Sequence, residues 1–138
     1  MKARCHKLSG HYSHTMKILI IEDNLELSWI LADCLKKEGF ETHTAANGAL
    51  GVKAALSHLP DLVLLDYNLG DMTGHDVAVA IKNMRKTSKI PFVVLSSIGA
   101  DPMMVNGFSK FPNCRGTLAK TLPTKDVLKA IHRALPVN

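Results

Sequence analysis

Two apolar runs of the chain end in acidic residues. Residues 62–65 are followed directly by Asp66, and residues 18–21 are followed by Glu22 and Asp23. A short continuous apolar run is typical of a strand that is buried on both faces of a parallel sheet. Because the carboxyl ends of such strands lie along one edge, where open α/β sheets bind ligands, we expect the three carboxylates to converge. Their negative charges need a cation, and hard oxygen ligands suit Mg²⁺.

The same acidic residues have the chemistry for phosphoryl transfer. Asp66, beside a bound cation, is a candidate nucleophile that attacks phosphorus through its carboxylate. Mg²⁺ held by Asp23 and Asp66, with Glu22 acting through water, would neutralise phosphoryl oxygens. The backbone carbonyl of Asn68, which follows Asp66 closely in the chain, is a candidate further ligand.

Two later predicted strands are also followed by polar groups. Ser96 follows residues 92–95, and Lys120 follows residues 115–119. The Ser96 hydroxyl and the Lys120 ammonium group would each take a phosphoryl oxygen, since phosphoryl transfer depends mainly on positioning and charge neutralisation. Taken singly, each of these residues has an ordinary explanation, such as a turn cap, a strand end or a surface lysine. Their common position at one edge of one predicted sheet favours the functional interpretation.

The periodicity of the chain predicts the elements that would position these groups. Strands are predicted at residues 17–22, 40–45, 61–66, 92–95 and 115–119. Helical spacing of apolar residues predicts helices at 27–35, 49–56, 74–84 and 127–135, and a short helix around 101–109. Gly39 and Pro60 end the first two helices, and Pro136 ends the last. This alternation predicts an α/β fold, a doubly wound five-stranded parallel sheet with right-handed crossovers.

Length and composition indicate one globular domain. The chain has 138 residues, of which 46% are hydrophobic and 21% are charged. Residues 16–138 form the predicted domain, whereas residues 1–15 show no periodicity and are expected to be a flexible extension or a remnant of expression. No apolar stretch approaches the ~20 residues that span a bilayer, and no signal-peptide core is present. Three widely spaced cysteines favour reduced thiols and a cytoplasmic location over a disulfide framework.

The net charge of +5 is distributed in a way that does not favour nucleic-acid binding. Residues 1–15 hold three basic and no acidic residues, which leaves 14 basic against 12 acidic residues in 16–138. Lys82, Arg85, Lys86 and Lys89 form a local cluster at roughly helical spacing, which we interpret as a solvated face. No DNA-binding motif is present, and the chain ends about one helix after Lys120, so we expect no nucleic-acid-binding output domain.

Together these residues resemble the receiver domain of two-component response regulators, over about residues 16–136. That family has an acidic pair, a phosphoacceptor followed by a turn glycine, a Ser or Thr hydroxyl and an invariant lysine. In this chain the corresponding positions are Glu22 and Asp23, Asp66 and Gly74, Ser96, and Lys120. As a set, these motifs are specific to the family.

The resemblance implies the flavodoxin-like (βα)5 receiver fold and a role in signalling. A sensor histidine kinase or histidine phosphotransfer protein would donate a phosphoryl group to Asp66 with Mg²⁺. The domain would catalyse its own phosphorylation and its later dephosphorylation. Phosphorylation would then draw in the Ser96 hydroxyl and shift the surface of the fourth helix, fifth strand and fifth helix, which a downstream protein target would read.

Several positions depart from the family pattern. Thr121 follows the lysine where Pro is usual, Thr117 stands where a switch aromatic is usual, and Gly70 stands where Pro is frequent. Residues 108–114 also lack the usual small-residue approach to the fifth strand. The sequence therefore predicts complete phosphorylation machinery with an altered output relay and without an aromatic rotamer switch.

Other functions stay open. The chain could be a receiver-like interaction module that acts without phosphate, or a Mg²⁺-dependent phosphohydrolase. A flavodoxin-like nucleotide binder is disfavoured because no glycine-rich phosphate loop follows the first strand. A homodimer through the last helix, with Lys125, Lys129 and Arg133 on its exposed side, is compatible with the sequence, although solvation explains these charges equally well.

Overall fold

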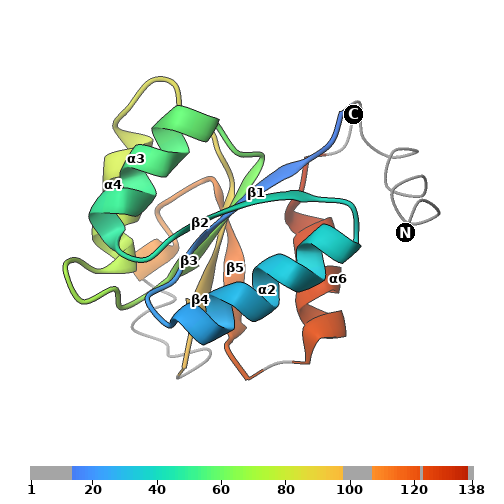
Figure 1. The fold of residues 1–138 in the computed structure, drawn as a ribbon. Coiled ribbons are helices and arrows are strands. Elements are labelled where there is room, and N and C mark those ends of the chain that lie inside the picture. Colours follow the sequence, from blue (N-terminus) through green and yellow to red (C-terminus); the bar gives the residue numbers. More distant parts are fainter. Residues whose placement is uncertain (1–13, 98–106, 122, 137–138) are drawn as a thin grey trace.

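A five-stranded parallel sheet forms the centre of the protein, with helices on both faces (Figure 1). The computed structural model describes residues 14–97, 107–121 and 123–136. The strands are β1 (Lys17–Ile21), β2 (Glu41–Ala45), β3 (Leu62–Asp66), β4 (Phe92–Ser96) and β5 (Cys114–Ala119), in the order β2-β1-β3-β4-β5. Within the described residues the helices are α2 (Leu25–Lys37), α3 (Gly48–His58), α4 (Gly74–Lys82) and α6 (Thr124–Ala134). The predicted α/β fold class and the parallel sheet are therefore confirmed.

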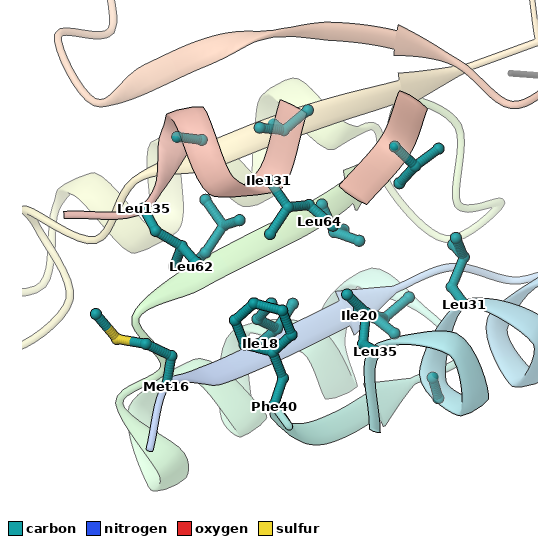
Figure 2. Close-up of a cluster of buried hydrophobic side chains, with 14 of the residues drawn as sticks. Met16, Ile18, Ile20, Leu31, Leu35, Phe40, Leu62, Leu64, Ile131 and Leu135 are labelled. Atoms are coloured by element: carbon teal, nitrogen blue, oxygen red, sulfur yellow. The ribbon is translucent and has the colours of Figure 1, made fainter. Parts of the chain in front are cut away.

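Alternate residues of the central strands face two separate apolar layers. Ile18 and Ile20 of β1, with Leu62 and Leu64 of β3, contact α2 and α6 (Figure 2). The residues between them on the same strands join a second cluster with α3 and α4, which includes Leu19, Ile21, Val63, Leu65, Ala55, Val77, Ala78 and Ile81. Burial on both faces explains why these strands are continuous apolar runs in the sequence. It also makes the sheet a rigid support for the residues at its carboxyl edge.

Polar caps fix where the helices beside that edge begin. The Asn24 side chain accepts a hydrogen bond from Leu27 N (3.1 Å) at the start of α2, directly after the first acidic pair. Thr73 and Asp76 form a capping box at the start of α4. Both caps restrain short loops that leave the carboxyl ends of β1 and β3.

The helix predicted at residues 74–84 is shorter than the sequence pattern indicated. The helical spacing extended to Met84, but α4 ends at Lys82. The reason is Thr87, a fully buried residue whose hydroxyl donates to the Ile81 carbonyl oxygen (2.6 Å) and so occupies an acceptor in the last turn of the helix. The basic cluster is exposed as expected, but only Lys82 lies in a helix, and Arg85, Lys86 and Lys89 lie in the turns that follow.

Some sequence predictions fall largely outside the described residues. The short helix expected around residues 101–109 lies mostly in 98–106, and the N-terminal extension lies mostly in 1–13, for which the structure gives no description. Of the three cysteines, Cys34 and Cys114 are described, and neither forms a disulfide bond. Among the described helices, none combines the length and the apolar character that crossing a membrane requires.

Candidate functional site

The strand order brings four chain segments to one edge of the sheet. β1, β3, β4 and β5 are consecutive neighbours, and Asp66 of β3 pairs in register with Leu95 of β4. Ser96, the last residue of β4, pairs with Ala119 of β5, and its carbonyl oxygen accepts a hydrogen bond from Lys120 N (3.0 Å). The residues that end or follow these strands therefore lie at the same level of the sheet.

Three carboxylates meet at this edge. Glu22, Asp23 and Asp66 each offer an oxygen atom, and these three atoms all lie within 4.8 Å of one another. Glu22 is 0% exposed and Asp66 is 2% exposed, whereas Asp23 is open to solvent. The buried pair is held by backbone contacts: Glu22 Oε2 accepts from Asn24 N (3.1 Å), and Asp66 Oδ1 accepts from Asn68 N (3.3 Å). The structure thus places a polar group of high negative charge against the apolar core.

Lys120 connects the two buried acids. From the end of β5 its ammonium Nζ reaches Glu22 Oε2 (3.0 Å) and Asp66 Oδ1 (3.1 Å). Burial by itself would lower the pKa of this lysine, but the two carboxylates outweigh burial and raise the pKa above its ordinary value. Lys120 therefore carries its positive charge at neutral pH and partly compensates the acids.

One lysine does not neutralise three carboxylates. Burial raises the pKa of Asp66 to about 7; contact with Lys120 opposes the shift, and the neighbouring Asp23 and Glu22 add to it. For Asp23, burial favours a higher pKa, but contacts with Asp66 and Glu22 and the charge of Lys120 lower it below the ordinary value. Negative charge beyond what Lys120 balances is thus concentrated at the sheet edge.

The unsatisfied oxygens of this cluster fit a hard divalent cation. Among the described residues, Glu22 Oε1 and Asp66 Oδ2 are buried side-chain oxygens without a hydrogen-bond partner. A buried carboxylate oxygen without a partner is costly, and coordination of a cation removes that cost. Mg²⁺ prefers carboxylate and carbonyl oxygens and keeps several waters, which suits a site with one side open at Asp23. The donor set therefore fits Mg²⁺.

The other predicted site residues lie around this group. Ser96 is 4% exposed at the end of β4, and Asn68 follows Asp66 in an exposed position. Thr117 pairs with Val94 within β5, where it is half-buried, and Thr121 is exposed directly after Lys120. Thr117 and Thr121, which depart from the receiver pattern, thus lie on the strand and loop around Lys120 and supply none of the charged groups of the cluster.

The sequence analysis did not single out Asp71. This residue lies in the loop between β3 and α4, and its carboxylate accepts hydrogen bonds from Gly48 N (2.9 Å) and Ala49 N (3.1 Å) at the start of α3. These backbone bonds hold the pKa of Asp71 below its ordinary value. A local sequence signal was absent because the donors lie more than twenty residues earlier in the chain.

Comparison with known proteins identifies relatives over most of the chain. A family model described as the response regulator receiver domain matches residues 18–132. Chemotaxis protein CheY of Bacillus subtilis (strain 168) is 29% identical over 120 residues, which cover 86% of this chain and 97% of that protein. The probable transcriptional regulator ycf29 of Pyropia yezoensis is 24% identical over 119 residues, and the match covers 86% of this chain but only 53% of that longer protein.

The fold has close counterparts among solved structures. Chemotaxis response regulator CheY4 of Vibrio cholerae superposes with a TM-score of 0.82 at 23% sequence identity, and the match covers 88% of this chain and 100% of that chain. At this identity the match demonstrates a shared fold alone.

Proposed function

Because this chain belongs to the receiver domain family of response regulators, we propose that it accepts a phosphoryl group on Asp66 with Mg²⁺ and then alters a protein-binding surface. The phosphodonor would be a sensor histidine kinase or a histidine phosphotransfer protein. The observation that carries the proposal is the state of Asp66, a buried carboxylate with an unpartnered oxygen beside two further acids and a lysine.

Each residue of the site has its own role in the proposed phosphoryl transfer. An Asp66 carboxylate oxygen attacks phosphorus, the bond from phosphorus to the donor imidazole nitrogen breaks, and the imidazole keeps the electron pair. A Mg²⁺ ion, when bound, would neutralise charge on the phosphoryl oxygens. Asp23 and Asp66, with Glu22 and the Asn68 carbonyl, would hold that ion. These groups act by positioning and charge, which are the main requirements of phosphoryl transfer.

Lys120 and Ser96 are proposed to bind the phosphoryl group after transfer. Lys120 already lies 3.1 Å from Asp66 Oδ1, so its ammonium needs only a small movement to contact a new phosphoryl oxygen. Ser96 ends the neighbouring strand, and its hydroxyl is the proposed second donor. Asp66 would lose a negative charge at the carboxylate and gain a phosphoryl group, and this change is the proposed signal.

The test is phosphorylation by a small phosphodonor. Incubation with acetyl phosphate and MgCl₂, followed by intact-mass spectrometry, is expected to add one phosphoryl group to the wild type and none to Asp66→Asn. Asp33→Asn is the matched control, because Asp33 is an aspartate on α2 that pairs with Lys37 and is not one of the three clustered acids. Absence of the adduct on the wild type, or its presence on Asp66→Asn, would contradict the proposal.

An interaction module that acts without phosphate is the second candidate function. Thr117 and Thr121 favour it, because they replace residues that usually relay the signal in this family. Beryllofluoride, a phosphoryl analogue, distinguishes the two functions. It is added together with Mg²⁺, and the amide NMR spectrum of the protein is recorded before and after the addition. Shifts of the Ser96 and Lys120 amides support phosphorylation, and an unchanged spectrum supports the module. Repeated turnover of an unrelated phosphate ester would instead indicate a phosphohydrolase.

The phosphodonor is proposed to dock on the exposed start of α2. Leu25 is 71% exposed and Trp29 is 68% exposed, and both lie on the first turns of the helix that follows Asp23. Large apolar side chains at this exposure are typical of protein-binding surfaces. Since histidine kinases act on cytoplasmic receivers, we also propose a cytoplasmic location. A homodimer through α6 stays a prediction.

A further inference from the structure

The start of α3 obtains its hydrogen-bond acceptors from two different parts of the chain. The first backbone N–H groups of a helix have no partner within the helix and need an external acceptor. Asn47 supplies its side-chain oxygen to Leu50 N (2.9 Å) and its carbonyl oxygen to Gly51 N (2.9 Å). Asp71 supplies one carboxylate oxygen to Gly48 N and the other to Ala49 N. One half of the cap is therefore local, and the other half comes from the loop after Asp66.

The loop that carries Asp71 is itself tightly folded. Asn68 and Thr73 form an antiparallel bridge, and Leu69 N donates to the Met72 carbonyl oxygen (3.2 Å). Gly70 N donates to Asn68 Oδ1 (3.3 Å), and Gly70 has a φ of +83°, which favours glycine. A restraint applied at Asp71 is therefore transmitted through one short turn to Asn68.

A close packing contact supports the same junction. A Cβ atom on Gly48 would lie 2.1 Å from Met72 Cγ and 2.4 Å from Met72 Sδ. The absence of a side chain at Gly48 leaves room for the Met72 side chain to pack against the start of α3. The hydrogen bonds of Asp71 and the contact of Met72 thus join adjacent loop residues to the same helix terminus.

We infer that Asp71 is a positioning residue for the cation site, which holds the Asn68 carbonyl in place by clamping the loop to the start of α3. The inference rests on the proposed function, because the proposed binding of Mg²⁺ gives the Asn68 carbonyl its role. Groups that orient a metal ligand without touching the metal commonly change metal affinity when they are removed. The clamp connects α3, which supplies no ligand to the cation site, to the loop that carries the proposed Asn68 ligand.

The experiment compares the two halves of the α3 cap. Asp71→Ala removes the half that belongs to the loop, and Asn47→Ala removes an acceptor from the same helix end without touching the loop. MgCl₂ is titrated into each full-length protein, and binding is followed by the NMR shifts of the Asp23 and Asn68 amides. Asp71→Ala is expected to raise the Mg²⁺ dissociation constant about tenfold. Asn47→Ala is expected to leave it unchanged, and Asp71→Asn, which keeps one acceptor oxygen, should fall between wild type and Asp71→Ala.

A second measurement reports on the clamp without metal. Hydrogen exchange of the Leu69 amide in metal-free protein should be faster in Asp71→Ala and unchanged in Asn47→Ala, because only the first variant releases the loop. An unchanged dissociation constant in Asp71→Ala, or an equal rise in both variants, would overturn the inference. If wild type shows no Mg²⁺ shifts, the metal part of the proposed function fails. The exchange rates of the Leu69 amide then test the clamp independently of the metal. Equal rates in the wild type, Asp71→Ala and Asn47→Ala would also overturn the inference.

Discussion

Asp66 is an acid whose protonation is coupled to the stability of the domain. Its pKa is about 7 in the folded protein, against an ordinary value of 3.8, chiefly because it is buried. The folded state therefore keeps a proton that the unfolded state releases as the pH rises from about 4. By linkage, a carboxyl group with a raised pKa lowers stability as the pH rises through this window.

The first prediction concerns this pH window. In metal-free buffer with EDTA, the free energy of unfolding of the wild type should fall between pH 5 and pH 7.5. Asp66→Asn cannot gain the charge and should be more stable than the wild type at pH 7.5 by about 1–3 kcal/mol. Urea unfolding at both pH values measures the difference. The same pH dependence in wild type and Asp66→Asn would show that another group is responsible, and Asp33→Asn serves as the control.

At the scale of single elements, the start of α2 and the packing of α3 decide how the site is presented. The α2 surface beside Asp23 is apolar and exposed at Leu25 and Trp29. The inner face of α3 contacts the last residue of β1, Ile21, directly before the acidic pair. The first turns of α2 therefore expose apolar side chains beside the acids, and α3 packs against the strand that carries two of those acids at its end.

The second prediction concerns partner binding by α2. Trp29→Ala should slow phosphoryl transfer from a histidine phosphotransfer protein about tenfold, as expected for an interface tryptophan. Its reaction with acetyl phosphate should be unchanged, because a small donor does not need the surface. Leu56→Ala is the matched control, since Leu56 is 43% exposed on α3. An equal loss with both donors would indicate that Trp29 affects the acidic site itself.

The third prediction concerns the packing of α3. A Cβ atom on Gly51 would lie 2.6–2.9 Å from three side-chain atoms of Ile21. Gly51→Ala favours the helix intrinsically, but the overlap should dominate and destabilise the domain by about 1–3 kcal/mol. Urea unfolding measures the loss. Ile21→Val, added to Gly51→Ala, should restore part of it, and Ser57→Ala on the exposed side of α3 should be near neutral. An unchanged or raised stability of Gly51→Ala would contradict the packing argument.

At the scale of the whole molecule, folding concentrates acids at one edge of a sheet in a basic protein. The chain has a net charge of +5, yet the carboxyl edge of its sheet brings three carboxylates together with one lysine. Folding therefore brings like charges together at this edge, which opposes folding. Because the three carboxylates meet only in the folded state, a ligand that neutralises them together binds the folded state. Such a ligand must stabilise the whole domain.

The fourth prediction follows from this coupling. At pH 7.5, MgCl₂ at ten times its dissociation constant should raise the free energy of unfolding by about 1.4 kcal/mol. NaCl at equal ionic strength should give a smaller effect, because screening does not satisfy the buried oxygens. Asp23→Asn should reduce the Mg²⁺ effect. Thermal unfolding in both salts measures it, and equal stabilisation by both salts in the wild type would rule out a specific cation site.

The sequence predicted the elements best where burial is greatest. Strands such as β3, which is buried at every position, appear as unbroken apolar runs that few other structures produce. It was wrong about the end of α4, because the buried hydroxyl of Thr87 ends that helix through a hydrogen bond to Ile81 O. Helical periodicity continues past this point and contains no sign of a tertiary hydrogen bond.

For the candidate site, the sequence by itself determined which residues lie at strand ends. Asp66 and Glu22 each follow an apolar run and Lys120 follows the predicted fifth strand, and the rule that parallel strands end at one edge was enough to bring them together. The tertiary structure alone decided how they pair: Lys120 contacts both buried acids, and Asp71 caps a helix that begins 23 residues earlier. The physical reason is that burial and strand periodicity are local properties of a chain, whereas hydrogen bonds and ion pairs between distant residues exist only after the strand order is fixed.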